Sequence, residues 1–299
     1  MRFVPALLVV AALAAPAAAQ DPVALKWSLK EGDLFYTNNR ADMDMSMSVL
    51  GQDVTIKMKM TAVQRYKILS AKPGATKVEL TMLTMKMEAE GLPPGAGGLG
   101  DIGDRVKGAT VTATLNDELE VTKVEGYEKF IDKLAGDNAE ERKQMKAQFS
   151  ETAVGQMVSQ VFSFAPPKPV KVGDTWNRSD KVPTGGFGDA TVKQKFKLDS
   201  VTDGVAKLGL EGDMAFKPGD GAFPGLPPGV KVTKFDLKAD KITGTVLFDT
   251  KTGRLKETKQ NMSFNGTIAM SANGMDLEMK MKIKAVQTAT VTDKNPTKD

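Results

Sequence analysis

The chain has 299 residues and a formal net charge of +4, and it contains neither histidine nor cysteine. Without cysteine there is no disulfide, thiolate nucleophile or zinc–thiolate site, and the bacterial lipoprotein route, which modifies a cysteine, is excluded. Without histidine the chain lacks the usual general base near neutral pH and the commonest metal ligand. Charges of both signs are interspersed and aromatic residues make up 6%, so we expect no nucleic-acid partner, which would want a clustered basic patch with aromatic platforms.

The first nineteen residues have the pattern of a secretory signal peptide. Arg2 supplies the positive charge, Phe3 begins a short apolar core, and Ala17, Ala18 and Ala19 provide the small residues that precede cleavage. We therefore expect residues 1–19 to be removed and the mature protein to be periplasmic or secreted. No later stretch approaches eighteen apolar residues, so we expect no transmembrane segment.

Most of the mature chain has the pattern of β-strands with one buried face. Apolar and polar residues alternate over several long runs, which is the period of a strand. Two runs near the C-terminus are joined by Asn273-Gly274, the strongest short signal for a β-hairpin. Such alternation is typical of an antiparallel sheet with one solvated face. Methionine fills many of the apolar positions: Met43, Met45, Met47, Met58, Met60, Met279 and Met281.

One predicted strand changes phase along its length. Val78, Leu80 and Met82 follow one alternation, whereas Leu83 and Met85 follow the other. A slip of one residue would turn the second half of the strand to the wrong face of the sheet. We therefore predict a β-bulge near Met82-Leu83, which would absorb the slip and increase the curvature of the strand.

Residues 126–167 are the one stretch with helical periodicity. Apolar residues recur at i, i+3, i+4 and i+7 from Tyr127. Asn138 is placed to cap a second helix, with Glu141 as its capping-box partner, and a third apolar run follows at 154–162. An apolar helix face beside a curved sheet either plugs and completes the core or forms a lid over a cavity, and the plug is the commoner arrangement.

The sequence also contains an internal repeat. The phrase Gly-Leu-Pro-Pro-Gly occurs at 91–95 and again at 225–229, and Lys-Glu-Gly-Asp at 30–33 matches Lys-Val-Gly-Asp at 171–174. Further matches follow in the same order, which predicts duplication of one unit. The expected fold is mainly β, with two duplicated curved antiparallel sheet units joined by a short helical segment. The expected organisation is a first β unit at 20–125, the helical connector at 126–167, and a second β unit at 168–299 with a C-terminal hairpin and a short polar tail.

No set of side chains indicates a reaction. The Asp, Glu and Lys residues fill polar strand positions or turns, so we expect no catalytic residue, no cofactor and no enzymatic activity. Methionine thioethers bind Cu(I), and this remains a remote alternative for the Met-x-Met strands. In a strand, however, Met-x-Met places both side chains on one face, where methionine is an adaptable apolar filler. We therefore predict that the seven methionines named above line an apolar surface and that the protein has no metal site.

Two further motifs carry a resemblance. Lys-Pro-Val-Lys-Val-Gly-Asp-Thr-Trp at 168–176 and Phe-Asp-Thr-Lys-Thr-Gly-Arg-Leu at 248–255 follow the signal peptide, the Gly-Asp strand opener and the helical middle in that order. This arrangement resembles an uncharacterised family of secreted bacterial proteins of about this length, over nearly the whole mature chain. The resemblance implies no activity and no site residues. More loosely, curved sheets with helices are similar to periplasmic lipoprotein carriers, which hold acyl chains in a half-barrel, although a shared fold does not establish function.

Two functions from different classes are compatible with these patterns. The first is a non-enzymatic exported envelope protein that binds an apolar small molecule or lipid on concave, methionine-lined sheet faces. The second is a structural or protein-interaction module of the cell envelope, for which no sequence feature identifies a protein partner. An apolar cavity of at least a few hundred Å³ between sheet and helices would favour the first, and a fully packed interior would favour the second.

Overall fold

The computed structural model describes residues 21–49, 52–91, 102–183, 189–217, 230–272 and 275–297. The predicted signal peptide and most of the two Gly-Leu-Pro-Pro-Gly segments lie outside these residues. The described strands are β1 (Leu34–Val49), β2 (Gln52–Lys72), β3 (Ala75–Glu90), β4 (Thr110–Leu115), β5 (Val121–Glu125), β6 (Thr175–Pro183), β7 (Asp189–Thr202), β8 (Val205–Lys217), β9 (Val230–Asp249), β10 (Arg254–Ala272) and β11 (Met275–Thr292). The described helices are α1 (Ile102–Val106), α2 (Tyr127–Ala135), α3 (Ala139–Gln148), α4 (Glu151–Ser159) and the 3₁₀ turn η1 (Gln160–Phe162).

These strands form one antiparallel sheet in the order β5-β4-β3-β2-β1-β11-β10-β9-β8-β7-β6. The predicted mainly β, antiparallel class is therefore confirmed. From β5 to β1, and again from β11 to β6, each strand lies beside its neighbour in sequence, so the strand numbers fall across the sheet in both halves. Pairing between β1 and β11 extends from Tyr36 opposite Thr292 to Val49 opposite Met279. The two expected sheet units thus continue into one another as a single sheet.

The local strand predictions agree with the observed registers. Val49 pairs with Gln52 where β1 is followed by β2, and β10 pairs with β11 at the predicted C-terminal hairpin. Within the β2–β3 pair, Val63 lies opposite Thr84 and the next residue of β2 lies opposite Met82. Leu83 is therefore the extra residue of a β-bulge, which confirms the phase slip predicted at this position.

The two Lys-x-Gly-Asp openers adopt the same local structure. In the first, the Asp33 carboxylate accepts a hydrogen bond from the Lys30 N–H at 2.8 Å, and the Gly32 N–H donates to the Ile68 carbonyl at 2.9 Å. Gly32 has a φ of 87°, a left-handed conformation that favours glycine. The second opener repeats these bonds at Lys171, Gly173, Asp174 and Leu198. This equivalence supports the predicted duplication, which superposition of the two complete halves would test.

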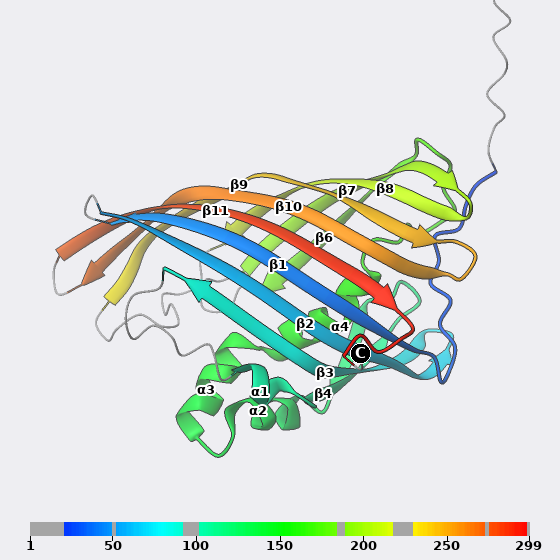
Figure 1. Ribbon diagram of the computed structural model, residues 1–299, viewed down its shortest axis with the longest axis horizontal. Helices are drawn as coiled ribbons and strands as arrows, with labels where there is room; N and C mark the ends of the chain where they lie inside the picture. Colours follow the sequence, from blue (N-terminus) through cyan, green and yellow to red (C-terminus); the bar gives the residue numbers. More distant parts are fainter. Residues whose placement is uncertain are drawn as a thin grey trace, which may run out of the picture.

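The helical connector packs against one part of the sheet. Figure 1 shows the sheet arching over the helices, which gather beneath β2, β3 and β4. Helix α4 contacts β4, β5 and β6, and β5 and β6 are the two edges of the sheet. The sheet therefore curls until both of its edges reach the same helix.

The connector completes the main core, as expected for a plug. Phe162 is 1% exposed and its ring lies against Trp27, Phe35 and Tyr66 at centroid separations of 4.8, 6.4 and 6.3 Å. The Phe35 and Tyr66 rings stack at 4.9 Å. Aromatic pairs at such separations add to the free energy gained by burial. The N-terminal segment, the first two strands and the end of the connector thus share one aromatic cluster.

The predicted helix cap at Asn138 is present. Its side-chain oxygen accepts hydrogen bonds from the backbone N–H groups of Glu140 and Glu141 at 2.9 and 3.2 Å. The Glu141 carboxylate accepts a hydrogen bond from Arg105 in α1. The expected capping-box residue therefore ties α3 to α1, so the long-range ion pair determines where its side chain points.

Candidate functional site

The methionines of β1 lie on the face of the sheet that packs against the helical connector, here called the inner face. Phe35, at the start of β1, is fully buried and contacts Phe162 of the connector. The registers of β1 with β2 and β11 have no shift, so every second residue after Phe35 faces the same side. Met43, Met45 and Met47 therefore extend the inner face away from the aromatic core.

The other predicted methionines join the same surface from neighbouring strands. Met58 and Met60 precede Tyr66 at even spacing in β2, without an intervening register shift against β1. On β11, Met281 lies opposite Met47 and Met279 lies opposite Val49. The sheet thus brings together all seven predicted lining residues, here called the methionine zone: Met43, Met45, Met47, Met58, Met60, Met279 and Met281.

The methionine zone differs from the core in its exposure. All seven side chains are half-buried, whereas Phe35 and Ile68 are fully buried. The residues between them in sequence, including Asp44, Ser46 and Lys280, are exposed on the opposite face. This surface is therefore apolar, continuous across three strands and partly accessible. Ligand binding by it stays a prediction.

A polar group lies between the methionine zone and the aromatic core. Gln64 Oε1 accepts hydrogen bonds from Thr37 Oγ1 at 3.0 Å, Asn39 Nδ2 at 3.2 Å and Tyr66 Oη at 3.3 Å. Tyr66 Oη also lies 3.2 Å from the Met157 carbonyl oxygen of α4, and its burial raises the pKa of the phenol. The inner face therefore changes along the strands from aromatic to amide and hydroxyl, and then to thioether.

A second feature, missed by the sequence interpretation, lies where the sheet edges approach α4. A cavity of about 410 Å³ between β5, α4 and β6 is lined by Glu120, Glu151, Gln156, Arg178 and Asp180, among others. Trp176, which stacks on Phe196, precedes Arg178 and Asp180 at alternating positions. This alternation in the sequence could have indicated that two charged residues face inward on an edge strand.

The environment of Asp180 differs from that expected of a solvated strand position. Burial raises the pKa of its carboxyl group, Arg178 opposes this increase, and Glu120 adds to it. Lys123 and Glu151 also line the cavity. One half-buried acid beside one arginine offers a polar, partly enclosed site but lacks the arranged nucleophile and base of a hydrolase.

We expect Asp180→Asn to increase the free energy of unfolding at pH 7. A carboxyl pKa that is raised by folding makes the native state bind a proton more readily than the unfolded state, so stability falls as pH rises through the folded pKa. The difference between variant and wild type should therefore be small near pH 3 and largest at neutral pH, as measured by urea unfolding. Asp42→Asn is the control of opposite sign, because hydrogen bonding to Arg40 lowers the pKa of Asp42; equal effects of both variants at pH 7 would contradict the assignment.

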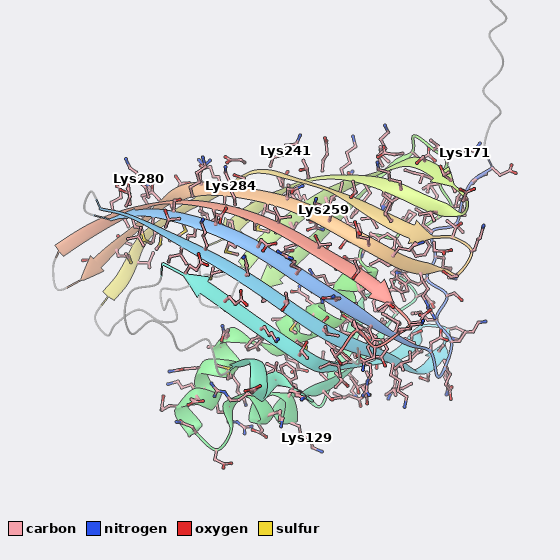
Figure 2. The ribbon with its side chains drawn as sticks, viewed as in Figure 1. Lys129, Lys171, Lys241, Lys259, Lys280 and Lys284 are labelled. Atoms are coloured by element: carbon pink, nitrogen blue, oxygen red, sulfur yellow. The ribbon has the colours of Figure 1, made fainter. Side chains whose placement is uncertain are left out.

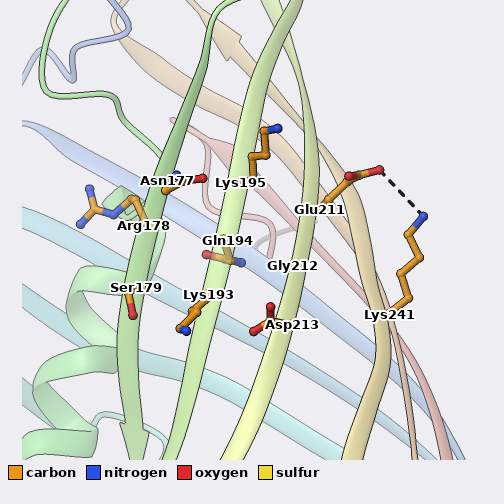
Figure 3. Close-up of a pocket in the computed structure, with 10 residues that line it drawn as sticks. All are labelled: Asn177, Arg178, Ser179, Lys193, Gln194, Lys195, Glu211, Gly212, Asp213 and Lys241. Carbon is orange, nitrogen blue, oxygen red and sulfur yellow. Dashed lines mark ion pairs between the residues drawn. The ribbon is translucent and has the colours of Figure 1, made fainter.

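The outer face carries a broad polar hollow of about 610 Å³ (Figure 3). It is formed by exposed side chains of β6 to β9, including Lys193, Lys195 and Asp213, and Glu211 lies 3.8 Å from Lys241. Figure 2 shows that Lys241 and Lys280 also project from the side turned away from the helices. These groups are typical of a solvated sheet surface with mixed charge.

The amino-acid sequence matches the family model described as "Family of unknown function (DUF6263)" over residues 41–255. The protein belongs to this family. No curated protein matches the chain significantly. In the described residues, no helix is long and apolar enough to cross a membrane, and no group of three or more Asp or Glu residues is arranged to hold a metal ion.

The solved structures that match this DUF6263 protein share little sequence with it. A structure titled "Lipid-protein interactions in lipovitellin" matches at a TM-score of 0.51 and 7% identity, covering 90% of this chain and 26% of that chain. The protein therefore spans about a quarter of the lipovitellin chain. DynF from the dynemicin pathway of Micromonospora chersina (10% identity, covering 93% of this chain and 91% of that chain) and a DUF1329 family protein from Desulfovibrio piger (9%, 87% and 84%) match at TM-scores of 0.20 and 0.17.

Proposed function

We propose that this protein is a non-enzymatic, exported envelope protein that holds an apolar ligand of the lipid class against the methionine zone. The observation that carries the proposal is the continuous, half-buried thioether surface on β1, β2 and β11, backed by exposed polar residues on the opposite face. Methionine suits such a surface because its unbranched side chain adapts to ligands of irregular shape. Export rests on the signal-peptide pattern of residues 1–19.

The size of the methionine zone is compatible with an acyl chain. From residue 41 to residue 49, β1 extends roughly 26 Å at about 3.3 Å per residue. One leaflet of a bilayer has a hydrocarbon thickness of about 15 Å, half that of the whole core. A fatty-acyl chain therefore fits along the strands without leaving the apolar surface. The fold shared with lipovitellin, in a structure whose title names lipid–protein interactions, adds support at the level of architecture.

The alternative is a structural or protein-interaction module. It is favoured by the aromatic core under the connector, where Phe35, Tyr66 and Phe162 are almost fully buried and leave no room for a ligand. The two functions differ in what they require of the methionine zone. Lipid binding needs that surface to be apolar, whereas a module that works through its loops or outer face does not.

Met45→Glu should reduce the bound lipid at least tenfold in native mass spectrometry of protein purified from its own envelope fraction. A carboxylate introduced into an apolar contact must be desolvated when the ligand binds, which is costly. Ser46→Glu is the matched control, since Ser46 is the next residue on the same strand and is exposed on the other face. Circular dichroism and thermal unfolding would show that both variants fold.

Two results would overturn the proposal. One is that the wild-type protein neither co-purifies with a lipid nor binds an added one, which would favour the structural module. The other is tight Cu(I) binding in a competition titration that is abolished by Met45→Leu, a nearly isosteric change expected to cost less than ~1.5 kcal/mol of stability. That second result would assign the methionine zone to copper instead.

A further inference from the structure

The row of residues that borders the methionine zone is polar but uncharged. Ala41 of β1 lies opposite Gln287 of β11, and Gln287 lies opposite Gln260 of β10. One step further along the strands the pairs are Met43 with Ala285, and Ala285 with Met262. Two neighbouring glutamines therefore stand at the boundary of the apolar surface, on the same face.

These two glutamines are available to a ligand. Both side chains are half-buried, and neither makes a hydrogen bond to another residue in the described part of the chain. On the far side of Gln260 the sheet has Gly244, where an added Cβ atom would lie 3.3 Å from Gln260 Cγ and 2.3 Å from the Lys259 carbonyl oxygen. A side chain at position 244 would clash with β10, so glycine is required where the two strands approach closely beside Gln260.

The hydrogen-bonded group around Gln64 lies nearer the aromatic core, because Gln64 is opposite Thr37, whereas Gln287 is opposite Ala41, four residues further along β1. Thr37 and Asn39 contact Gln64 from β1, and Tyr66 links the group to the Met157 carbonyl of α4. Together with Gln260 and Gln287 these residues form an amide belt, defined as Thr37, Asn39, Gln64, Gln260 and Gln287. The amide belt separates the closed aromatic core from the open methionine zone.

The charge of this region limits the class of ligand. Within the described inner-facing positions of β1 (37–47), β2 (54–66), β10 (258–270) and β11 (279–291), every side chain is uncharged. An anionic or cationic head would lose its hydration there without gaining an opposite charge, which is strongly unfavourable. Amides, in contrast, both donate and accept hydrogen bonds and suit hydroxyl and ester oxygens.

We infer that the ligand is an uncharged amphiphile, such as an acylglycerol, whose hydroxyl or ester head lies on the amide belt while its acyl chain follows the methionine zone. This inference rests on the proposed lipid binding and adds the class of head group and the direction in which the ligand lies. Gln260 and Gln287 provide the selectivity because their amides have no partner among the described residues. The Gln64 group, which is held by its own hydrogen bonds, forms the polar surface next to them.

The test is a competition between three ligands that share an oleoyl chain. Mature protein is mixed with equal concentrations of monoolein, oleate and oleoyl-lysophosphatidylglycerol at pH 8, and bound adducts are measured by native mass spectrometry. Monoolein should exceed each charged probe by about tenfold or more, the scale of two hydrogen bonds plus the avoided burial of a charge. The Gln260→Leu/Gln287→Leu variant should bind monoolein only through its acyl chain. Its monoolein adduct should be at least fivefold weaker than that of wild type.

The matched control is Asn261→Leu/Thr288→Leu, which changes the adjacent residues of the same two strands on the outer face. This control should keep the wild-type preference. Equal binding of the three probes, preference for an anionic probe, or an unchanged preference in the glutamine variant would overturn the inference while leaving lipid binding in place. Absence of all three adducts from wild-type protein would instead overturn the proposed function itself.

Discussion

Phe162→Ala is expected to lower the free energy of unfolding by about 3–5 kcal/mol, the range for truncation of a buried aromatic side chain. Phe162 is 1% exposed and contacts the rings of Trp27, Phe35 and Tyr66. Its removal would leave a cavity between the N-terminal segment, the first two strands and the connector. Urea unfolding followed by tryptophan fluorescence measures the effect, because Trp27 lies directly beside the lost ring.

Phe149→Ala provides the control for this prediction. Phe149 belongs to the same connector but is half-buried, and among the aromatic rings of the described residues it contacts Phe130, at a centroid separation of 6.4 Å. We expect a loss of about 1–2 kcal/mol, since less apolar surface is removed from contact. If Phe162→Ala cost no more than Phe149→Ala, the connector would rest on the sheet as a detachable lid, and the interpretation of the helices as part of the core would be wrong.

Arg254→Ala is expected to cost about 2–3 kcal/mol of stability. The Arg254 guanidinium lies 2.5 Å from Asp33 Oδ2, donates to the Ser28 carbonyl and stands 5.7 Å from the centre of the Phe35 ring. The two charged side chains are only 19% and 25% exposed. Removing the arginine therefore leaves a partly buried carboxylate without its partner, which costs more than the pair itself contributes. Arg40→Ala is the matched control: Arg40 pairs with Asp42 at an exposed site, where solvent screens the pair and its removal should change stability much less.

The same ion pair should depend on pH. Burial raises the pKa of the Asp33 carboxyl, but hydrogen bonds from Arg254 and the Lys30 N–H outweigh it and leave the pKa below its usual value. A lowered carboxyl pKa contributes stability that is present above the unfolded value, about 3.9, and lost as pH falls through the folded value. The difference between wild type and Arg254→Ala should therefore shrink below pH 4. A difference that stayed constant down to pH 2 would assign the effect to packing on Phe35 instead.

The local features of the fold were predictable because short stretches of sequence determine them. The strand faces, the bulge at Leu83 and the cap at Asn138 each depend on residues a few positions apart. The pairing of β1 with β11 does not, since it joins residues about 250 positions apart and no local pattern specifies it. For this reason the sequence indicated the two sheet units but not that the β1–β11 pair joins them into one sheet.

The candidate site was predictable to a similar extent. Period-two alternation placed the seven methionines on one face, and the strand registers then supplied their assembly into one surface. The amide belt was missed although its members follow the same alternation: Gln287 is two positions from Ala285, and Gln260 is two positions from Met262. Glutamine at an inward position looks like an ordinary polar residue until the register shows that another glutamine lies beside it.

The central position of the β1–β11 pair has a consequence for how the protein is made. During synthesis β1 emerges early, whereas β11, its second neighbour in the sheet, is the last of the described strands to appear. Until then one edge of β1 has unpaired backbone groups beside an apolar row, the kind of edge that associates with other chains. Closing so long a loop is also slow. Completion of folding must therefore await the C-terminal hairpin, and a chain truncated before Met275 should be prone to aggregation and to capture by chaperones.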